Sequence, residues 1–505
     1  MAAILQYTPI DILEATVVQL RDSFNAGITT SLAYRKKQLK RLYDLIKDNE
    51  ALLLKALHKD LRKHAVESIG AEIAPVTEEC LWFLENLDAL AKEEKVKPRN
   101  FLNKVGGSNV IRKDPLGIVL IIGAWNYPIQ LLLVPFVGAI AAGNTAVLKP
   151  SEVSPHTAAA LTALLPNYLD PRCYRIVNGA VPETTRLLEL HFNHIFYTGN
   201  PEVGKIVMSA AAKHLTSVTL ELGGKSPTII APDVDMQVVT NRIAFGKFYN
   251  AGQVCIAPDY VLIQRNQVPE FVKAFRKTMQ DFYQGQPEKS EGYARIVSER
   301  HWDRLEAVLS NKKSGKVIIG GQNNKSDLFF APTVITDVDN HDESLMGDEI
   351  FGPILPVISV DNIDQAIDIV NSREPPLVLY LFSKSHKITE KVLSKTQSGG
   401  VCVNDTLMHQ AEYALPFGGT GRSGLGSYHG KKSFDVFTHE RSVMIKKQSG
   451  DALLASRYPP YTQQKAAIIR RITMSSAMGI WIRRHSKLVK FVVLLVVLFV
   501  LNKRR

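Results

Sequence analysis

The chain has 505 residues, 45% of them hydrophobic, which is ordinary for a globular enzyme and long enough for about two or three domains. Its net charge of +12 lies wholly after residue 444, where 13 Lys and Arg face one acid, because the first 444 residues hold 48 charges of each sign. A neutral body gives no support for nucleic-acid binding. The four cysteines are far apart, without a CxxC pair, so we expect neither a disulfide framework nor a metal site, and a reducing compartment fits.

Residues 10 to 95 are predicted to form helices, because apolar residues such as Leu39, Leu42 and Ile46 recur at helical spacing with charges between them. The basic run from Arg35 to Arg41 lies on such a helix, and we interpret it as a solvated face rather than a localisation or nucleic-acid element. The N-terminus lacks the basic start and apolar run of a signal peptide. The sequence therefore predicts a helical N-terminal segment without an export signal.

From about residue 110, short apolar runs separated by Gly, Pro and Asn replace the helical pattern. Continuous Val, Ile and Leu runs with helical segments between them predict a parallel sheet covered on both faces. This is the doubly wound α/β class, which binds nucleotides at the carboxyl ends of its strands. A second alternation of helices and strands, from about 235 to 425, predicts a second α/β domain. The runs are GIVLIIGAWN, TAVLKPSE, YRIVNG, HIFYTGN and SVTLELGGKSPTII in the first region, and VLIQ, GKVIIGG, ILPVISV and LVLYLFS in the second.

Three turns in these regions contain residues that are candidates for phosphate binding or catalysis. HIFYTGNPEVGK places Gly199 and Gly204 where a strand leads into a helix, which fits either a phosphate-binding loop or a plain strand-to-helix turn. TLELGGKSP places Glu221 at a strand end, as a general base or as a surface glutamate before a turn. NAGQVC holds Cys255, which is a nucleophile or a small buried hydrophobe. Each pattern alone leaves both readings open.

The C-terminal segment ends in eleven uninterrupted apolar residues, 491–501, extended to residue 488 if Lys490 turns its charge outward. A bilayer span needs about 20 apolar residues, so this one is short and could be a core helix or strand. Basic residues on both sides make burial in a core costly and favour a tail anchor formed by residues 488–502. Such an anchor would insert after synthesis and leave the body of the protein in the cytosol. We expect the endoplasmic reticulum first, with the mitochondrial outer membrane or the peroxisome as alternatives.

The order of the motifs resolves the ambiguous turns. GAWNYP (123–128), LKPSE (148–152), FYTGNPEVGK (196–205), LELGGKSP (220–227), NAGQVC (250–255), DEIFGP (348–353) and LPFGGTGRSG (415–424) follow one another along the chain. Their spacing resembles the aldehyde dehydrogenase superfamily from about residue 15 to 462. VNDTLMH (403–409), GSYHGKKSFDVFTHERS (426–442), RYPPY (457–461) and the basic apolar tail resemble its class 3 branch, with its membrane-bound fatty aldehyde dehydrogenases.

This resemblance implies three catalytic roles. Cys255 would add to the aldehyde carbonyl and give a thiohemiacetal, since sulfur both attacks and leaves well. The amide of Asn126 and the backbone N–H of Cys255 would hold the developing oxyanion. Hydride transfer to a nicotinamide would leave a thioester, and Glu221 would activate the water that hydrolyses it to a carboxylic acid.

The resemblance also implies a cofactor site. Lys149 and Glu349 would bind ribose hydroxyls, Gly199 and Asn200 would meet the pyrophosphate, and Glu152 would face the adenosine ribose and repel the phosphate of NADP. NAD is therefore the expected cofactor, with NADP as a possible second. Two departures stand out, because Pro201 removes one N–H from the helix start and Asn200 replaces the serine of many relatives. The remaining cofactor residues implied are Gly204 in the same loop, Phe351 near the nicotinamide ribose, and Trp125 and Pro150 nearby.

The expected fold is an aldehyde dehydrogenase fold with a Rossmann-like cofactor domain, an α/β catalytic domain, a small bridging sheet and a C-terminal membrane helix. The expected function is NAD-dependent oxidation of long-chain or lipophilic aldehydes by a homodimer at a membrane surface. Aromatic aldehydes or apocarotenals are alternative substrates, and a non-catalytic membrane-surface binding protein is the alternative of another class. The domains are residues 1–222 for cofactor binding, with bridging strands at 98–113, then 223–425 for catalysis, 426–450 for bridging, 451–487 as linker and helix, and 488–502 as anchor.

Overall fold

The structure, a computed structural model, describes residues 5–98, 107–449, 451–473 and 484–485. The chain divides into two compact units, which are considered separately below. The larger unit spans residues 1–91 and 114–439, and the smaller spans 92–113 and 440–505.

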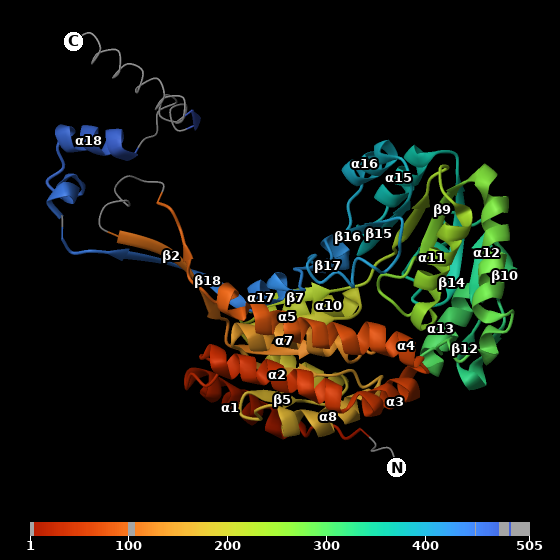
Figure 1. The fold of residues 1–505 in the computed structure, drawn as a ribbon, viewed down its shortest axis with the longest axis horizontal. Coiled ribbons are helices and arrows are strands. Elements are labelled where there is room, and N and C mark those ends of the chain that lie inside the picture. The colour runs from red at the N-terminus through yellow and green to blue at the C-terminus, as the bar shows by residue number, and fades with distance from the viewer. Residues whose placement is uncertain (1–4, 99–106, 450, 474–483, 486–505) are drawn as a thin grey trace, which may run out of the picture. The chain divides into compact units, whose positions relative to one another are not determined.

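The larger unit alternates helices and strands along the chain (Figure 1). Its helices are α1 (Leu13–Asn25), α2 (Leu32–Asp48), α3 (Glu50–Leu61), α4 (Ala65–Ser68), a π-helical turn (Ile69–Ile73), α5 (Ala74–Leu90), α7 (Gln130–Ala142), α8 (Pro155–Tyr168), α9 (Val181–Glu189), α10 (Pro201–Ala212), α11 (Met236–Phe248), α12 (Val268–Tyr283), α13 (Glu299–Ser310), α14 (Glu343–Met346), α15 (Ile363–Asn371), α16 (His386–Lys395) and α17 (Lys431–Val436). Short 3-10 turns include Tyr249–Gly252 and Gly421–Ser423.

The strands of this unit form two larger sheets. The six-stranded sheet has the order β17-β7-β6-β3-β4-β5, and the seven-stranded sheet has the order β10-β13-β14-β9-β8-β15-β16. The first is made of β3 (Ile118–Ile122), β4 (Thr145–Lys149), β5 (Tyr174–Ile176), β6 (His194–Thr198), β7 (Ser217–Glu221) and β17 (Gly424–Leu425). The second is made of β8 (Pro227–Ile230), β9 (Tyr260–Gln264), β10 (Lys316–Ile319), β13 (Thr333–Thr336), β14 (Ile354–Val360), β15 (Val378–Phe382) and β16 (Gly400–Val403), and β11 (Asn323–Asn324) pairs separately with β12 (Phe329–Phe330).

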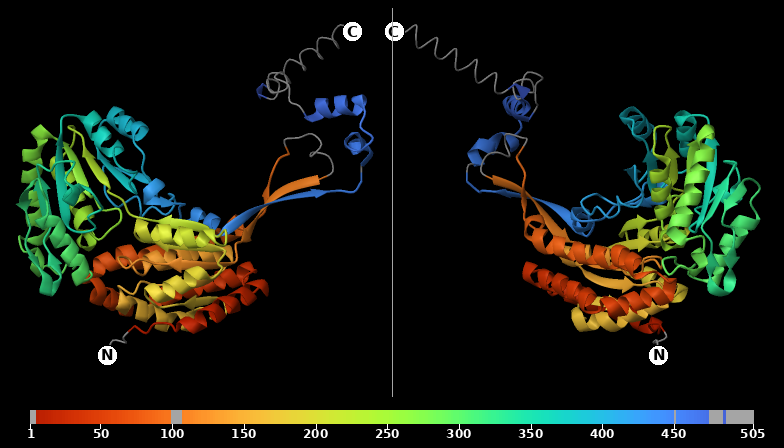
Figure 2. Two further views of the ribbon diagram at one scale, coloured as in Figure 1. Left: turned by 180° about the vertical axis from the view of Figure 1, so that it is seen from behind. Right: turned by 45° about the vertical axis from the view of Figure 1, so that its right-hand side comes forward.

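The six-stranded sheet is parallel except for the short edge strand β17. Alternate residues of its central strand β3 enter different cores. Ile118 and Leu120 pack with α1, α9 and α10, whereas Val119 and Ile121 pack with α2, α5, α7 and α8. Figure 2 follows these helix layers from two further directions. The prediction of a parallel sheet covered on both faces is confirmed, and it explains why every residue of β3, β4 and β6 is buried.

The seven-stranded sheet is also parallel, with β10 antiparallel at one edge. A third core joins its strands to α11, α12, α13 and α15. The predicted α/β architecture is therefore present in both halves of the larger unit. Cys255 lies in the loop that enters β9, so this sheet carries the candidate nucleophile.

One cation of the predicted solvated basic run is buried, beside Gln38 and Leu39. Arg35 on α2 is buried, and its guanidinium donates hydrogen bonds to the carbonyl oxygens of Thr29 (2.9 Å), Thr30 (3.1 Å) and Ala141 (3.3 Å). A buried cation needs such acceptors, and the loop before α2 and the end of α7 supply them. Helical spacing alone does not reveal a carbonyl cluster formed by distant segments.

The smaller unit contains a three-stranded sheet in the order β1-β2-β18, a 3-10 turn (Asp451–Arg457) and helix α18 (Gln463–Thr473). β1 (Glu94–Lys95) runs antiparallel to β2 (Gly107–Pro115), and β18 (Thr438–Lys446) is largely exposed. β2 and β18 lie where bridging strands are predicted, and their role in joining two copies stays a prediction. Among the described residues, none of the helices has the length and apolarity needed to cross a membrane, and the predicted anchor at 488–502 lies outside those residues.

Candidate active site

Four parallel strands of the six-stranded sheet end at one edge, and each ends at or leads to a residue with a predicted role. β4 ends at Lys149 and β7 at Glu221, while β3 leads to Asn126 and β6 to Gly199. The register pairs Lys149 with the last residue of β3 and Glu221 with the last residue of β6. Parallel pairing therefore gathers residues more than 90 positions apart at the edge where doubly wound sheets bind ligands.

The loop with Cys255 turns sharply before reaching β9. Asn250 and Ala251 have φ angles of 49° and 51°, and Gly252 has a φ of 77°. Side chains other than glycine rarely adopt this region, so the surrounding packing must hold them there. In the fully described stretch 250–263, Cys255 is the only residue that is not buried. The turn thus leaves Cys255 as the one residue of intermediate exposure in this stretch, while its neighbours are packed away from solvent.

Asn126 is hydrogen-bonded to the loop that carries Cys255. Its Nδ2 donates to the carbonyl oxygen of Gln253 at 3.1 Å, and Asn250 Nδ2 donates to the carbonyl oxygen of Asn126 at 3.1 Å. Asn126 is only 3% exposed. On the other side of Cys255, the hydroxyl of Tyr380 donates to the carbonyl oxygen of Ile256 at 2.5 Å. The Asn126 amide and the Cys255 loop are therefore held in one hydrogen-bonded arrangement.

Glu221 is buried, with 3% of its surface exposed, and neither carboxyl oxygen has a hydrogen-bond partner among the described residues. Its main chain is fixed, because the N–H of Gly199 donates to the carbonyl oxygen of Glu221 at 3.0 Å and Gly424 pairs with it in the sheet. Burial raises the pKa of Glu221 well above its ordinary value, because desolvation disfavours the charged carboxylate. An unpartnered buried carboxyl is unfavourable for stability, and such groups concentrate at functional sites.

The electrostatics around Cys255 disfavour the thiolate in the resting site. Burial, followed by the neighbouring carboxyls of Glu349 and Glu221, raises the pKa of the Cys255 thiol, and the backbone N–H groups of Cys255 and Ile256 only partly oppose this. Burial and Asp259 likewise raise the pKa of Glu349. Burial and the two neighbouring carboxyls therefore work against ionisation of the resting Cys255 thiol.

Glu349 also lies against the glycine pair that follows Glu221. A Cβ atom added to Gly223 would stand 1.9 Å from Oε2 of Glu349, so only glycine leaves room for the carboxyl. This contact places the DEIFGP and LELGGKSP motifs side by side. The structure therefore brings Cys255, Asn126, Glu221 and Glu349 to one place.

A second group of predicted residues follows β4. The ammonium of Lys149, which is 5% exposed, forms an ion pair with Glu152 at 2.8 Å, and Pro150 between them is buried. The helix that follows, α8, is capped by Asp60, which accepts from the backbone N–H groups of His156 (3.0 Å) and Thr157 (2.8 Å). Asp60 was not among the predicted residues, because its contact with α8 spans almost 100 positions of sequence.

The third group begins α10. Asn200 caps the helix by accepting from the N–H of Val203 at 2.9 Å, and Pro201 is its first residue, as the sequence suggested. A Cβ on Gly199 would lie 2.1 Å from the hydroxyl of Tyr197, and one on Gly204 would lie 2.9 Å from a methyl of Leu222. Both glycines are therefore needed for close packing of the strand-to-helix turn.

This turn fits an anionic cofactor. The first N–H groups of α10 have no partner inside the helix, and the helix dipole favours negative charge there. The hydroxyl of Thr198, buried just before Gly199, has no hydrogen-bond partner among the described residues. The orphan hydroxyl and the helix start after β6, together with the cation of Lys149 at the end of β4, suit the phosphates and ribose of a dinucleotide.

Trp125 and Phe351, both predicted near the cofactor, contact each other edge to face with ring centroids 5.4 Å apart. Trp125 also meets the ring of His301 at 4.8 Å. Phe351 has a φ of 48°, and the guanidinium of Arg304 donates to the carbonyl oxygen of Ile350 at 2.7 Å, which holds this unusual backbone. Neither His301 nor Arg304 stands in a motif, so sequence patterns gave no sign of them.

Asp259 is a further residue that sequence reasoning missed. It is 2% exposed and forms ion pairs with Lys225 (2.8 Å) and Lys247 (3.3 Å), and it accepts from the backbone N–H of Ile350. Burial works to raise the pKa of Asp259, but the two ammonium groups outweigh burial and hold it below its ordinary value. Asp259 thereby links the loops that carry Cys255, the glycine pair and Glu349. Its sequence signal was only an acid between Pro258 and an apolar strand.

Replacing Asp259 by asparagine is expected to destabilise the fold by about 3–5 kcal/mol, because two buried ammonium groups lose their counter-ion. Urea unfolding followed by circular dichroism measures the change. Asp364→Asn is the matched control, since Asp364 pairs with Lys391 at 2.6 Å on the surface, where removal of one partner changes stability by about 0–1 kcal/mol. Equal, small effects of the two substitutions would contradict this role of Asp259.

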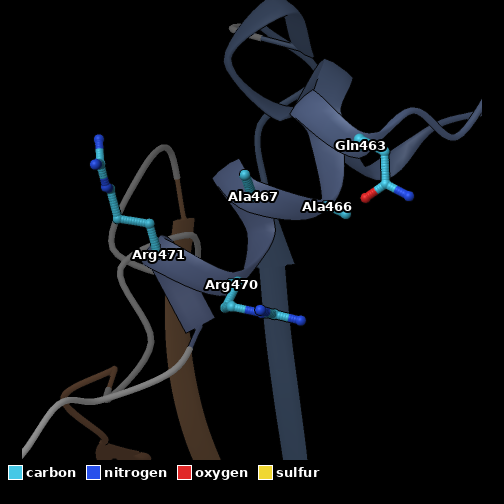
Figure 3. Close-up of a pocket in the computed structure, with 5 residues that line it drawn as sticks. All are labelled: Gln463, Ala466, Ala467, Arg470 and Arg471. Atoms are coloured by element: carbon cyan, nitrogen blue, oxygen red, sulfur yellow. The ribbon is translucent and has the colours of Figure 1, made fainter.

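The smaller unit contains a groove of its own. It runs along α18 and is lined by Gln463, Ala466, Ala467, Arg470 and Arg471 (Figure 3). None of the predicted site residues lines it, and its lining offers no nucleophile or carboxylate base. Within the described parts of the chain, no group of three or more His, Cys, Asp or Glu side chains is arranged to hold a metal ion.

Comparisons with known proteins place this site in a family. The model of the aldehyde dehydrogenase family matches residues 11–443. Aldehyde dehydrogenase family 3 member A2 of Mus musculus is 47% identical over 455 residues, covering 90% of this chain and 93% of that protein. The dimeric NADP-preferring aldehyde dehydrogenase of Rattus norvegicus is 45% identical over 445 residues, covering 88% and 97%. A substrate-bound aldehyde dehydrogenase structure from Staphylococcus aureus superposes with a TM-score of 0.87 at 39% identity, covering 90% and 98%.

These matches span both α/β halves and every motif from GAWNYP to LPFGGTGRSG. The chain therefore belongs to the aldehyde dehydrogenase family, within family 3, and oxidises aldehydes to carboxylic acids with NAD or NADP as cofactor.

Proposed function

We propose that Cys255, Asn126 and Glu221 are the catalytic residues of this enzyme, and that its substrates are lipophilic aldehydes, long-chain aldehydes above all, at a membrane surface. The observation that carries the catalytic assignment is the bonded pair of loops around Asn126 and Gln253. The side-chain amide of Asn126 is held against the carbonyl oxygen of Gln253, which precedes Cys255 by two residues. Cys255 is the one residue of intermediate exposure in this otherwise buried stretch. The unpartnered carboxyl of Glu221 supplies the third member.

In this mechanism, Cys255 Sγ attacks the aldehyde carbon while its proton passes to the developing oxyanion. The side-chain N–H of Asn126 and the backbone N–H of Cys255 donate to that oxyanion. NAD or NADP, when bound, supplies the hydride acceptor. Glu221 then takes a proton from water as the water attacks the thioester, and the acid leaves with Cys255 restored.

Lys149, Glu152 and Pro150 after β4, Gly199, Asn200 and Gly204 at α10, and Glu349, Phe351 and Trp125 beside them would hold the dinucleotide. We propose NAD as the preferred cofactor. Two carboxylates support this preference: Glu152 faces Lys149 at 2.8 Å, and Asp60 already caps α8. An extra phosphate near them would meet like charge. The rat relative is named NADP-preferring, so dual use is the second candidate.

Glu152→Gln is expected to lower the KM for NADP by roughly tenfold and to change the KM for NAD less, because one repelled charge near the phosphate contributes about 1.4 kcal/mol. Steady-state kinetics with each cofactor at saturating aldehyde measures the ratio of the two kcat/KM values. Glu202→Gln, on the exposed face of α10, is the matched control. An unchanged ratio in Glu152→Gln would remove Glu152 from the cofactor selectivity.

The substrate proposal follows from the C-terminal segment. Each CH₂ group contributes about 0.8 kcal/mol to partitioning into a bilayer, so a long-chain aldehyde resides where a tethered enzyme meets it. The test is kcat/KM with NAD in detergent micelles across saturated aldehydes of increasing length, beside benzaldehyde and an apocarotenal. A rise toward the longest chains is expected. A flat series with a maximum at an aromatic or polyene aldehyde would assign a different substrate class.

The membrane and dimer proposals have separate tests. Deleting residues 488–505 is expected to abolish co-sedimentation with phospholipid vesicles and to leave kcat on a short soluble aldehyde unchanged. A fluorescent fusion of the full chain is expected at the endoplasmic reticulum, with mitochondrial or peroxisomal signal as the contrary outcomes. Light scattering after size exclusion should give twice the chain mass of 56.1 kDa, as the name of the dimeric rat relative suggests.

A further inference from the structure

A buried ion pair lies beneath the Asn126 loop and has no part in the mechanism above. The ammonium of Lys63, between α3 and α4, is 2.7 Å from Oε1 of Glu72, and both side chains are fully buried. Glu72 stands on the π-helical turn Ile69–Ile73. Such turns are rare and occur frequently at functional sites, because the widened backbone redirects one side chain.

Both members of the pair continue to the segment that starts at Asn126. Lys63 Nζ donates to the carbonyl oxygen of Asn126 at 2.6 Å, and it lies 3.8 Å from the ring centroid of Tyr127. The second carboxyl oxygen of Glu72 accepts from the backbone N–H groups of Ile129 and Gln130, each at 3.0 Å. The pair therefore holds both ends of a five-residue segment that leads from β3 into α7.

We infer that Lys63 and Glu72 are positioning residues that aim the amide of Asn126 at the oxyanion. The inference rests on the proposed role of Asn126. Two donors, Lys63 and Asn250, fix the carbonyl of its peptide, and the side-chain amide then reaches the carbonyl of Gln253 beside Cys255. With its main chain fixed and its Nδ2 held, Asn126 has little freedom left to turn away from the thiol.

A contribution to the stability of the fold explains this buried ion pair less well than a positioning role does. Desolvation of two charges in a core offsets much or all of their attraction, so a buried ion pair is poor evidence of stabilisation. Here burial lowers the pKa of Lys63 and raises that of Glu72, and each group's partner opposes the change. The Lys63–Glu72 pair provides a precise arrangement of hydrogen bonds around the peptide of Asn126. Two apolar side chains in the same places would not provide it.

The test is a double-mutant cycle. K63M/E72Q removes both charges without leaving one buried alone, and the glutamine oxygen can still accept from the start of α7. The double substitution K63M/E72Q is introduced both into the wild-type protein and into N126A. We expect single-turnover rates of aldehyde oxidation to fall roughly tenfold to a hundredfold in the wild-type background, as for a small misplacement of a catalytic group. In N126A, the same change should alter the rate less than twofold, because the group being aimed is gone. The dissociation constant of NAD should be unchanged throughout.

The outcomes separate the two ideas. If N126A alone retains the wild-type rate, the proposed role of Asn126 fails. If N126A is slow but K63M/E72Q is as fast as wild type, or if the two losses multiply, the positioning role fails and that of Asn126 stands. Should K63M/E72Q not fold, K63Q/E72Q repeats the cycle, because the new amide at position 63 ends one bond short of the ammonium and no charge is left buried alone. In this second cycle too, an unchanged single-turnover rate, or rate losses that multiply with that of N126A, would overturn the inference.

Arg35→Met is the matched control. Arg35 is another buried cation that donates to backbone carbonyls, including Ala141 at the far end of α7 from Asn126. Its removal should lower the midpoint of urea unfolding and leave the single-turnover rate of the folded enzyme unchanged. A rate loss in Arg35→Met as large as that in K63M/E72Q would show that general loosening of α7 causes both, and the inference would fall.

Discussion

Cys255→Ala abolishes aldehyde-dependent formation of NADH, with a loss expected on the order of 10⁴-fold or more, since no other group can form the covalent intermediate. The fold should persist, because alanine is smaller and the Cys255 side chain is already partly exposed. NADH absorbance at saturating NAD and aldehyde gives the rate. Circular dichroism and cofactor binding verify that the variant is folded.

The matched control is Cys402→Ala in β16, the other thiol of intermediate exposure. It should retain wild-type turnover. Persistent activity in Cys255→Ala would disprove the covalent mechanism and would favour a different nucleophile. Loss of aldehyde oxidation with normal NAD binding would also dispose of the alternative that the chain is only a binding protein, because binding requires no thiol.

Glu221→Gln should divide the reaction into its two halves. The first half, up to the thioester, does not need Glu221 as base, so one NADH per site should appear in a rapid burst. Hydrolysis should then slow by about 10²- to 10⁴-fold, the usual contribution of a general base. Stopped-flow absorbance measures the burst, and intact-protein mass spectrometry should detect the acyl group on Cys255. A variant with no burst, or with unchanged steady turnover, would exclude this role.

The same substitution carries a stability prediction. The folded-state pKa of Glu221 lies well above the ordinary value of 4.5, so the folded protein binds a proton that the unfolded chain releases. Its contribution to stability is complete below that ordinary value and is lost as pH rises through the folded-state pKa. Glu221→Gln removes this loss, so its unfolding free energy should fall less than that of wild type between acidic and neutral pH. Parallel urea titrations at several pH values test the sign, with Glu202→Gln as the exposed control.

Sequence patterns predicted most strands of both sheets, because continuous apolar runs bounded by Gly and Pro leave few alternatives, but β13, β16 and β17 were not among the predicted runs. They also predicted the helix start at Pro201, where proline loses no helical hydrogen bond. The chemical residues are different, since Cys255, Glu221 and Asn126 were each ambiguous in isolation. Only the order of the motifs and the resemblance they carry made them candidates.

What the sequence could not predict are contacts between distant segments. Lys63 and Glu72 look like ordinary charges on a helical stretch, yet they contact the segment 126–130 more than 50 positions later. Asp259 gathers lysines from two separate segments in the same way. The sign of the Cys255 pKa shift was also out of reach, because it depends on burial and on two carboxyls brought near by the fold.

The distribution of thiols makes this chain a reporter of its own unfolding. Cys80 and Cys173 are fully enclosed, whereas Cys255 and Cys402 are only partly covered. A small alkylating reagent should therefore add at most two labels to native protein and four to unfolded protein, two states that differ in whole-molecule mass. The slow appearance of the third and fourth labels would time spontaneous opening of the core without any denaturant, and added NAD should lengthen that time in proportion to how tightly the folded state holds it.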